Sequence, residues 1–163
     1  MYFELVDKLK SISSAEKILG TTQRPIQVRL SDFNFYCCKH DKTEPKYFLL
    51  KELLASKFLL HIGITSPNIV LVDLEQEHIE HLNEQPSHLN DLVGFKWIDD
   101  AQEVDRHTEI KKTRIADRSV FLKILLFDIW ILNSDRTAFN ANLMMQRQST
   151  EDYIIPIDHG MAL

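Results

Sequence analysis

The chain has 163 residues, of which 44% are hydrophobic and 26% charged, and only two are cysteines. This balance is typical of one soluble domain and excludes a disordered segment, a disulfide scaffold and a membrane span, which needs roughly 20 consecutive apolar residues. The net charge of −5 is concentrated in residues 61–110, which hold two Lys or Arg against eleven Asp or Glu, and this distribution argues against direct nucleic-acid binding.

The first forty residues predict a helix followed by a β-hairpin. Apolar residues at helical spacing over Tyr2–Lys10 indicate a short amphipathic helix, and a following serine can cap a second turn that ends near Gly20. Alternating apolar and polar residues predict a strand over Ile26–Leu30, and turn residues then lead into a return strand over Phe35–Lys39. We therefore expect an antiparallel hairpin that ends at a lysine.

The middle of the sequence predicts a long helix and two further strands. A broad apolar face predicts a helix over Lys46–Ile62, followed by Gly63, where a helix C-terminus favours a left-handed residue. Asn68–Leu74 is typical of a buried strand, and Leu74–Asn83 of a short polar helix. A further short strand is predicted over Gly94–Ile98.

The second half predicts one long helix and a second hairpin. A helix is expected over Thr113–Leu132, followed by a polar loop over Asn133–Asn140. The expected buried positions of this helix are Ile115, Val120, Phe121, Ile124, Leu125 and Phe127. Two short strands, Asn142–Met145 and Tyr153–Ile157, then flank a polar turn. Strands in the first half and helix in the second predict an α+β fold.

The polar loop and the end of the second hairpin carry the most informative chemistry. Asp135 and Asn140 lie five residues apart in the loop, and Asp158 ends the hairpin in the sequence Asp-His-Gly. Phosphoryl transfer needs one carboxylate to orient the acceptor hydroxyl, and a second carboxylate with an amide oxygen to hold magnesium. An Asp-x-x-x-x-Asn loop followed by a strand and Asp-x-Gly is the arrangement that kinases use.

The first half supplies a complementary pair. Lys39 ends the predicted hairpin strand, and Glu52 lies on the helix that follows. In kinases a strand lysine, held by a helix glutamate, positions the nucleotide phosphates. Strand alternation puts the small side chain of Cys37 on the same face as Lys39, where a kinase covers the adenine.

These segments resemble the HipA-like kinases, a family of bacterial serine/threonine kinases with a protein-kinase-like fold distantly similar to phosphatidylinositol kinases. The resemblance covers about residues 20 to 163. It implies an ATP- and Mg²⁺-dependent enzyme in which Lys39 binds the ATP phosphates, Glu52 is its partner, Asp135 is the catalytic base, and Asn140 and Asp158 bind magnesium. The matching segments are Tyr36–Lys39, Lys51–Ala55, Gly63–Pro67 and Asn133–Arg136, together with Asn140 and Asp158.

The resemblance also places the phosphate-binding loop, although the glycines permit neither a P-loop nor a G-x-G-x-x-G motif. The loop is expected near residues 20–25, where Gly20, Thr21 and Thr22 would bind the nucleotide. Thr137 stands where relatives often carry histidine after Asp-Arg.

The implied domain is a kinase small lobe over about residues 1–93, followed by the hinge and catalytic core of the large lobe over about 94–163. Relatives continue after the Asp-x-Gly strand with an activation segment and several helices. We therefore expect a domain incomplete at its C-terminus, with an apolar surface covered by a partner chain or by self-association. The N-terminus shows no signal-peptide pattern, which favours a cytoplasmic protein.

The main functional hypothesis is a kinase that modifies serine or threonine on a protein. Two alternatives stay open: a lipid or small-molecule kinase, because phosphatidylinositol kinases share the Asp-Arg loop, and a non-catalytic nucleotide-binding or interaction module. The phosphoryl acceptor is not encoded in these motifs. A toxin–antitoxin setting is known among relatives, but the sequence itself carries no sign of it.

Six other residues invite a functional interpretation. His78 and His81 lie three apart and could share a metal, but a solvated polar helix is the favoured interpretation. Asp128 could support the catalytic loop through Arg136 or Arg118, or simply bond to backbone. His159 could touch the metal site, but the resemblance gives it a packing position. Phe95 and Trp97 are expected in the core rather than as a pair that stacks on a nucleotide.

Overall fold

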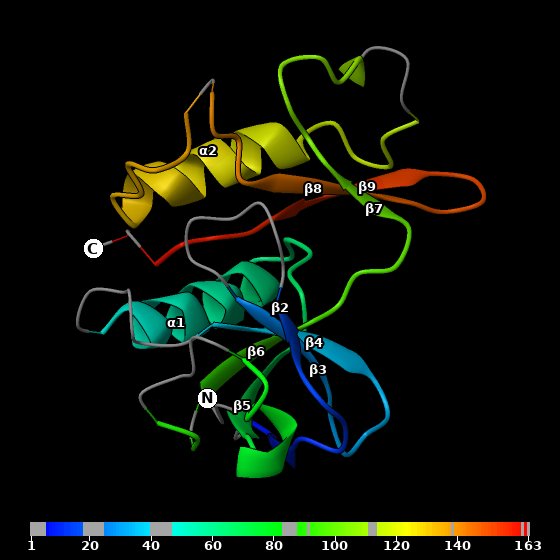
Figure 1. The fold of residues 1–163 in the computed structure, drawn as a ribbon. Coiled ribbons are helices and arrows are strands. Elements are labelled where there is room, and N and C mark those ends of the chain that lie inside the picture. The colour runs from blue at the N-terminus through cyan, green and yellow to red at the C-terminus, as the bar shows by residue number, and fades with distance from the viewer. Residues whose placement is uncertain are drawn as a thin grey trace. The chain divides into compact units, whose positions relative to one another are not determined.

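The computed structural model describes residues 6–17, 25–39, 47–82, 88–90, 92–110, 114–137, 139–160 and 162. The chain divides into two compact units, each containing one of the two β-sheets drawn in Figure 1. The first unit comprises Met1–Leu49 and Asn68–Trp97, and the second Leu50–Pro67 and Ile98–Leu163. Assigning these units to the lobes of a kinase, with a boundary near residue 93, stays a prediction.

The first unit is built on a six-stranded sheet with the order β1-β5-β6-β4-β3-β2. The predicted hairpin is confirmed, because β3 and β4 pair antiparallel with Val28 opposite Tyr36. β6 lies between β4 and β5 and begins two residues earlier than the sequence predicts. The strands are β1 (Lys8–Lys10), β2 (Glu16–Lys17), β3 (Ile26–Arg29), β4 (Phe35–Lys39), β5 (Ile69–Asp73) and β6 (Leu92–Lys96).

The prediction of an N-terminal helix is wrong over the residues that the structure describes. Lys8–Lys10 forms β1, which pairs in parallel with β5, and Glu16–Lys17 forms β2 at the opposite edge of the sheet. A three-residue strand is too short to show a period, and its partner lies some sixty residues further along the chain. Pairing with a distant strand therefore decided the conformation here.

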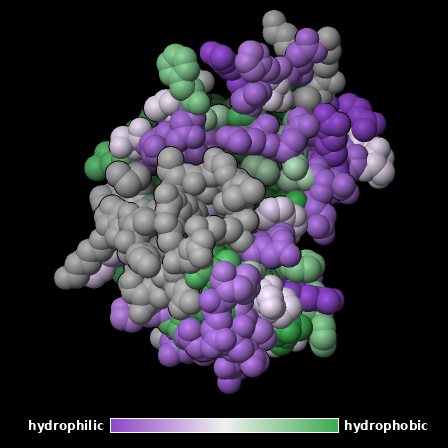
Figure 2. All heavy atoms as spheres, viewed as in Figure 1, coloured by the Kyte–Doolittle hydropathy of each residue, from purple (hydrophilic) through white to green (hydrophobic). Residues whose placement is uncertain are grey.

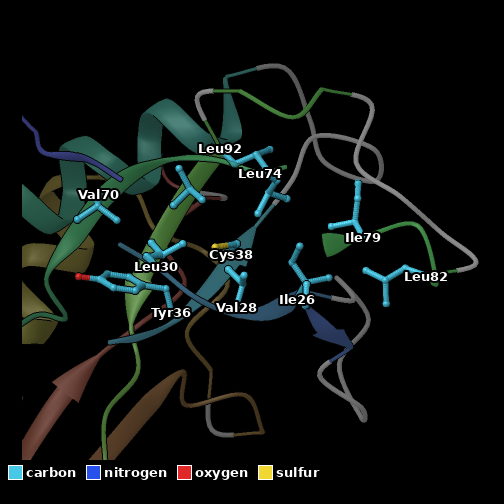
Figure 3. Close-up of a cluster of buried hydrophobic side chains, with 12 residues drawn as sticks. Ile26, Val28, Leu30, Tyr36, Cys38, Val70, Leu74, Ile79, Leu82 and Leu92 are labelled. Carbon is cyan, nitrogen blue, oxygen red and sulfur yellow. The ribbon is translucent and has the colours of Figure 1, made fainter. Parts of the chain in front are cut away.

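One face of this sheet carries a continuous apolar core (Figure 3). Tyr36 and Cys38 of β4 point into it, and burial raises the pKa of the Cys38 thiol well above its ordinary value. Cys37 and Lys39 alternate to the other face and are only partly buried. The other labelled side chains of this core come from β3, β5, β6 and the segments that follow β3 and β5: Ile26, Val28, Leu30, Val70, Leu74, Ile79, Leu82 and Leu92.

Gly94 lies in the middle of β6 and is required by close packing. A Cβ atom at this position would meet Val72 Cγ2 at 2.7 Å, Val70 Cγ2 at 3.3 Å and Cys38 Sγ at 3.4 Å. Since all three neighbours are buried, little room exists for an added methyl group.

We expect Gly94→Ala to destabilise the first unit by about 1–3 kcal/mol, the usual cost of overpacking. Urea unfolding followed through Trp97, the tryptophan of this unit, measures the change. The matched control repeats the substitution in a Val72→Ala background, where the nearest methyl group is gone and the added cost should shrink. An equal cost in both backgrounds would contradict the packing explanation.

The second unit combines two helices with a three-stranded antiparallel sheet. The helices are α1 (Phe48–His61), whose first two residues belong to the first unit, and α2 (Val120–Trp130). The sheet has the order β7-β8-β9, with β7 (Ala101–Glu103), β8 (Leu143–Arg147) and β9 (Asp152–Pro156). The α+β prediction and the second hairpin are thus confirmed, whereas β7 lies in an acidic segment that was not predicted as a strand.

The end of α1 agrees with the sequence. Gly63 has φ +76°, its N–H donates to the Leu60 carbonyl at 3.1 Å, and the Ile64 N–H donates to the Leu59 carbonyl at 2.9 Å. This bond pair is a Schellman motif, which satisfies the last carbonyl groups of the helix.

The two other predicted helices are shorter than expected. Leu74–Asn83 contains only the 3₁₀ turn η2 (Gln76–His78). The helix predicted from Thr113 begins at Val120, because Ile115 forms a parallel bridge with Asp152 and Asp117 accepts hydrogen bonds that start the helix at Ser119. Tertiary pairing and local capping therefore replaced the first helical turns.

Asp117 gives the second unit a predictable acid sensitivity. Hydrogen bonds from Lys123 and Ser119 lower the pKa of its carboxyl from 3.8 to about 2. A carboxyl with a lowered folded-state pKa stabilises the fold above pH 3.8 and loses this contribution as the pH falls to about 2. We expect Asp117→Asn to flatten the stability profile between pH 4 and 2, measured by urea unfolding through Trp130. Unchanged acid dependence would contradict this role.

α2 exposes much of its apolar surface. Only Ile124, Phe127 and Asp128 of the helix are buried, so the expectation that Leu125 is buried is wrong. In Figure 2, hydrophobic side chains reach the surface at several places on the face drawn. Exposed apolar patches of this kind are typical of interaction surfaces, although their partner stays a prediction. The large apolar side chains of α2 that are more than half exposed are Leu122, Leu125, Leu126, Ile129 and Trp130.

Candidate active site

Lys39 ends β4 in the first unit on the partly buried face of the sheet. Its Nζ lies 5.1 Å from the ring centre of Phe48 and 5.4 Å from that of Phe95. Two aromatic faces therefore surround the ammonium group, and Cys37 lies on the same strand face. Phe95 is only half-buried, beside Lys39, and Trp97 is 41% exposed, so the expectation that both belong to the core is wrong.

In the second unit, the end of α2 fixes the start of the polar loop. Asp128 is buried, and its carbonyl and carboxylate oxygens accept the backbone and side-chain N–H groups of Asn133, each at 2.9 Å. Asn133 Oδ1 in turn accepts the Asp135 N–H at 3.2 Å. Leu132, with φ +54°, allows the chain to turn back at this point. The helix end thus determines where Asp135 stands.

The structure brings together Asp135, the predicted catalytic base, and Asn140, a predicted magnesium ligand. Asn140 Nδ2 lies 3.3 Å from Asp135 Oδ2, and Asn142 Nδ2 donates to the same oxygen at 2.8 Å. Thr137 closes the loop, since its hydroxyl accepts the Asn140 N–H at 3.1 Å. Asp135 is therefore held by two side-chain amides, of which Asn142 was not predicted from the sequence.

Arg136 joins this loop to the segment that contains Asp158. Its Nε donates to Asp128 Oδ2 at 2.6 Å, and its Nη1 donates to the carbonyl groups of Ala141, at 2.7 Å, and Asn142. Its Nη2 donates to His159 Nε2 at 3.0 Å. The expected contact between Asp128 and Arg136 of the polar loop is confirmed by this ion pair, both partners of which are largely buried.

Asp158 follows β9 and is partly buried. The Ile157 N–H donates to the Asn142 carbonyl at 2.9 Å, so the residue before Asp158 pairs with the segment that directly follows the polar loop. The backbone N–H of His159 donates to Glu52 Oε2 at 3.0 Å, and Glu52 is 1% exposed. Glu52 thus has an observed contact within the second unit, whereas its pairing with Lys39 stays a prediction.

The oxygen donors of this site fit Mg²⁺. Among the residues that the structure describes, no three His, Cys, Asp or Glu side chains form a metal-binding group. Mg²⁺ in kinases needs fewer protein ligands, because substrate phosphates and water complete its octahedral shell. With the amide nitrogen of Asn140 turned towards Asp135, its carbonyl oxygen is the atom suited to a metal, and Asp158 supplies a carboxylate.

Other candidates from the sequence have structural roles or cannot be placed. His78 Nδ1 lies 2.8 Å from the Ser11 hydroxyl, and His81 Nε2 lies 2.8 Å from the Ala15 carbonyl, so both rings attach the N-terminal segment. The two histidines therefore form structural hydrogen bonds, in place of the shared metal site or the solvated helix considered from the sequence. The predicted phosphate-loop residues Gly20, Thr21 and Thr22 lie outside the described residues.

The fold of the chain is similar to that of a kinase whose structure has been solved. The chain matches the structure of the proinflammatory kinase CtkA of Helicobacter pylori with a TM-score of 0.58 and 16% identity. The match covers 98% of this chain but 61% of CtkA, so the chain spans about three-fifths of that kinase. At this identity the likeness concerns the fold alone.

The sequence places the chain in a particular family. A profile of the family described as HipA-like kinase matches residues 12–163, so the chain belongs to the HipA-like kinases. The resemblance found in the sequence is thereby confirmed. No curated protein sequence matches the chain. No helix in the described part of the chain is long and apolar enough to cross a membrane.

Proposed function

We propose that the chain is an ATP- and Mg²⁺-dependent phosphotransferase that acts in the cytoplasm on serine or threonine of a protein. The observation that carries the proposal is the second-unit network in which Asp135 contacts Asn140, while Arg136 joins their loop to the segment of Asp158. Such a network presents one candidate base and two oxygen ligands on connected segments, as phosphoryl transfer requires.

In this proposal each residue of the site has one role in phosphoryl transfer. Asp135 accepts the proton of the attacking hydroxyl, and its orientation is set by Asn142 and Asn140. Asn140 and Asp158 bind the Mg²⁺, which neutralises charge on the phosphates when it is bound. Lys39 binds the nucleotide phosphates, and family membership supports this role together with its place at the end of β4.

The nucleotide assignment in the first unit can be tested by thiol labelling. Cys37 is partly buried and shares a strand face with Lys39, whereas Cys38 is fully buried and its raised pKa keeps it as an unreactive thiol. We expect iodoacetamide to modify Cys37 first and MgATP to slow that modification. Cys37→Ser, which leaves only Cys38, should react very slowly with or without nucleotide. Labelling of Cys37 at the same rate with saturating MgATP would contradict the assignment.

The class of acceptor separates the proposal from its alternatives. Transfer of labelled γ-phosphate from ATP to protein supports a protein kinase, and transfer only to phosphoinositide vesicles would support a lipid kinase. Nucleotide binding without transfer to either acceptor would favour a non-catalytic module.

A further inference from the structure

His159 is a buried polar partner within the network. It directly follows Asp158, is 2% exposed, and its Nε2 lies 3.0 Å from Arg136 Nη2. Because a guanidinium group only donates hydrogen bonds, Nε2 must accept through its lone pair. The ring also contacts Phe127 edge to face, with ring centres 5.9 Å apart. His159 therefore packs as expected and, in addition, accepts a hydrogen bond from Arg136.

The peptide between Asp158 and His159 is held from two directions. Glu52 accepts the His159 backbone N–H at 3.0 Å, while Arg136 binds the His159 ring. Asp158 has φ +59°, a conformation that non-glycine residues adopt only when their surroundings require it. The two bonds on His159 hold the residue that directly follows this turn.

The same arginine fixes the loop on its other side. Arg136 also donates to the carbonyl groups of Ala141 and Asn142, the residues directly after Asn140. One cation thus sets both the backbone beside Asn140 and the side chain beside Asp158. A change in the hydrogen bond between Arg136 and His159 should therefore alter how these two oxygen ligands are placed relative to one another.

We propose that His159 is a positioning residue whose Nε2 lone pair, through Arg136, fixes Asp158 relative to the loop of Asp135 and Asn140. This proposal rests on the proposed function, because it assigns His159 to the placement of that site's metal ligands. His159 touches neither metal nor substrate in this role. Its contribution is the accepted hydrogen bond, which packing alone does not provide.

The matched variants are His159→Phe and His159→Gln. Phenylalanine keeps an aromatic ring beside Phe127 but cannot accept a hydrogen bond, whereas the glutamine side-chain oxygen can accept one from Arg136. His159→Met provides a second apolar variant if His159→Phe does not fold. Folding of each variant is checked through Trp130 fluorescence.

The decisive measurement is Mn²⁺ affinity in the presence of a non-hydrolysable ATP analogue, followed by electron paramagnetic resonance. Partners of metal ligands commonly affect metal affinity about 10–100-fold, so we expect His159→Phe to raise the Mn²⁺ dissociation constant at least about tenfold. His159→Gln should stay close to the wild-type value. Hydrogen exchange of the backbone amide at position 159 should be faster in His159→Phe than in the wild-type protein, and unchanged in His159→Gln.

Three results would overturn the proposal. Unchanged Mn²⁺ affinity in a folded His159→Phe variant would by itself overturn the proposal. This holds even if amide hydrogen exchange at position 159 is faster, because the residue would then only stabilise the fold. Equal weakening in His159→Gln and His159→Phe would exclude the accepted hydrogen bond as the cause. Absence of nucleotide-dependent Mn²⁺ binding in the wild-type protein would reject the proposed function and this proposal together.

Discussion

Asp135→Asn is expected to lower the rate of phosphoryl transfer about 10²–10⁴-fold, the usual contribution of a positioned general base. Asparagine keeps the size of the side chain, and its oxygen can still accept the Asn142 hydrogen bond that lies at 2.8 Å in the wild-type protein. What it loses is the negative charge and the ability to take a proton. The rate is measured as transfer of labelled γ-phosphate from ATP.

Two comparisons make this result specific. Nucleotide affinity of Asp135→Asn should stay near the wild-type value, since the metal ligands Asn140 and Asp158 are unchanged. Asp99→Asn, which alters an exposed carboxylate of the same unit, should transfer phosphate at the wild-type rate. Transfer by Asp135→Asn at the wild-type rate would show that Asp135 is not the base.

The buried ion pair between Asp128 and Arg136 gives the largest expected effect on stability. Their side chains are 7% and 11% exposed and meet at 2.6 Å. Arg136→Met removes the cation and leaves the Asp128 carboxylate buried without its charge partner. Breaking a buried pair from one side costs about 3–5 kcal/mol, so we expect a loss of this size in the free energy of unfolding.

A double-mutant cycle distinguishes this ion pair from general disruption. In Asp128→Asn with Arg136→Met neither member of the pair carries a charge, so the double variant should be more stable than the sum of the single effects predicts. A Trp97→Phe background leaves Trp130 as the only tryptophan, and urea unfolding then reports on the second unit. Additive effects, or a cost below about 1 kcal/mol for Arg136→Met, would contradict the account.

Sequence patterns predicted the elements whose signals are local. The hairpin of β3 and β4 has strict alternation around a turn, and α1 has a long apolar face closed by Gly63. The kinase residues were predicted because their order matches a known chemistry, and the structure places Asp135 beside Asn140. In each case the evidence lies within a short stretch of chain.

The remaining features depend on contacts between distant segments. β1 is a strand because it pairs with β5, and residues near Ile115 are not helical because they pair with Asp152. The apolar run of α2 is nearly continuous, so the sequence could not show which of its side chains are buried.

The supporting residues of the site were missed for the same reason. Asn142 and His159 act through hydrogen bonds to Asp135 and Arg136, and no local motif marks such partners. The Asn-Ala-Asn sequence at 140–142 is the one available signal, since it offers a second side-chain amide two residues after Asn140.

The central claim is that Asp158 binds a nucleotide-associated magnesium ion in a HipA-like kinase. Calorimetric titration of ATP, with Mg²⁺ or with a chelator, into the wild-type chain and Asp158→Asn tests it most directly. We expect binding by the wild-type chain that weakens strongly without Mg²⁺, and an Asp158→Asn variant that has lost most of this Mg²⁺ dependence. Equal Mg²⁺ dependence in both proteins, or no ATP binding by the wild-type chain, would contradict the claim.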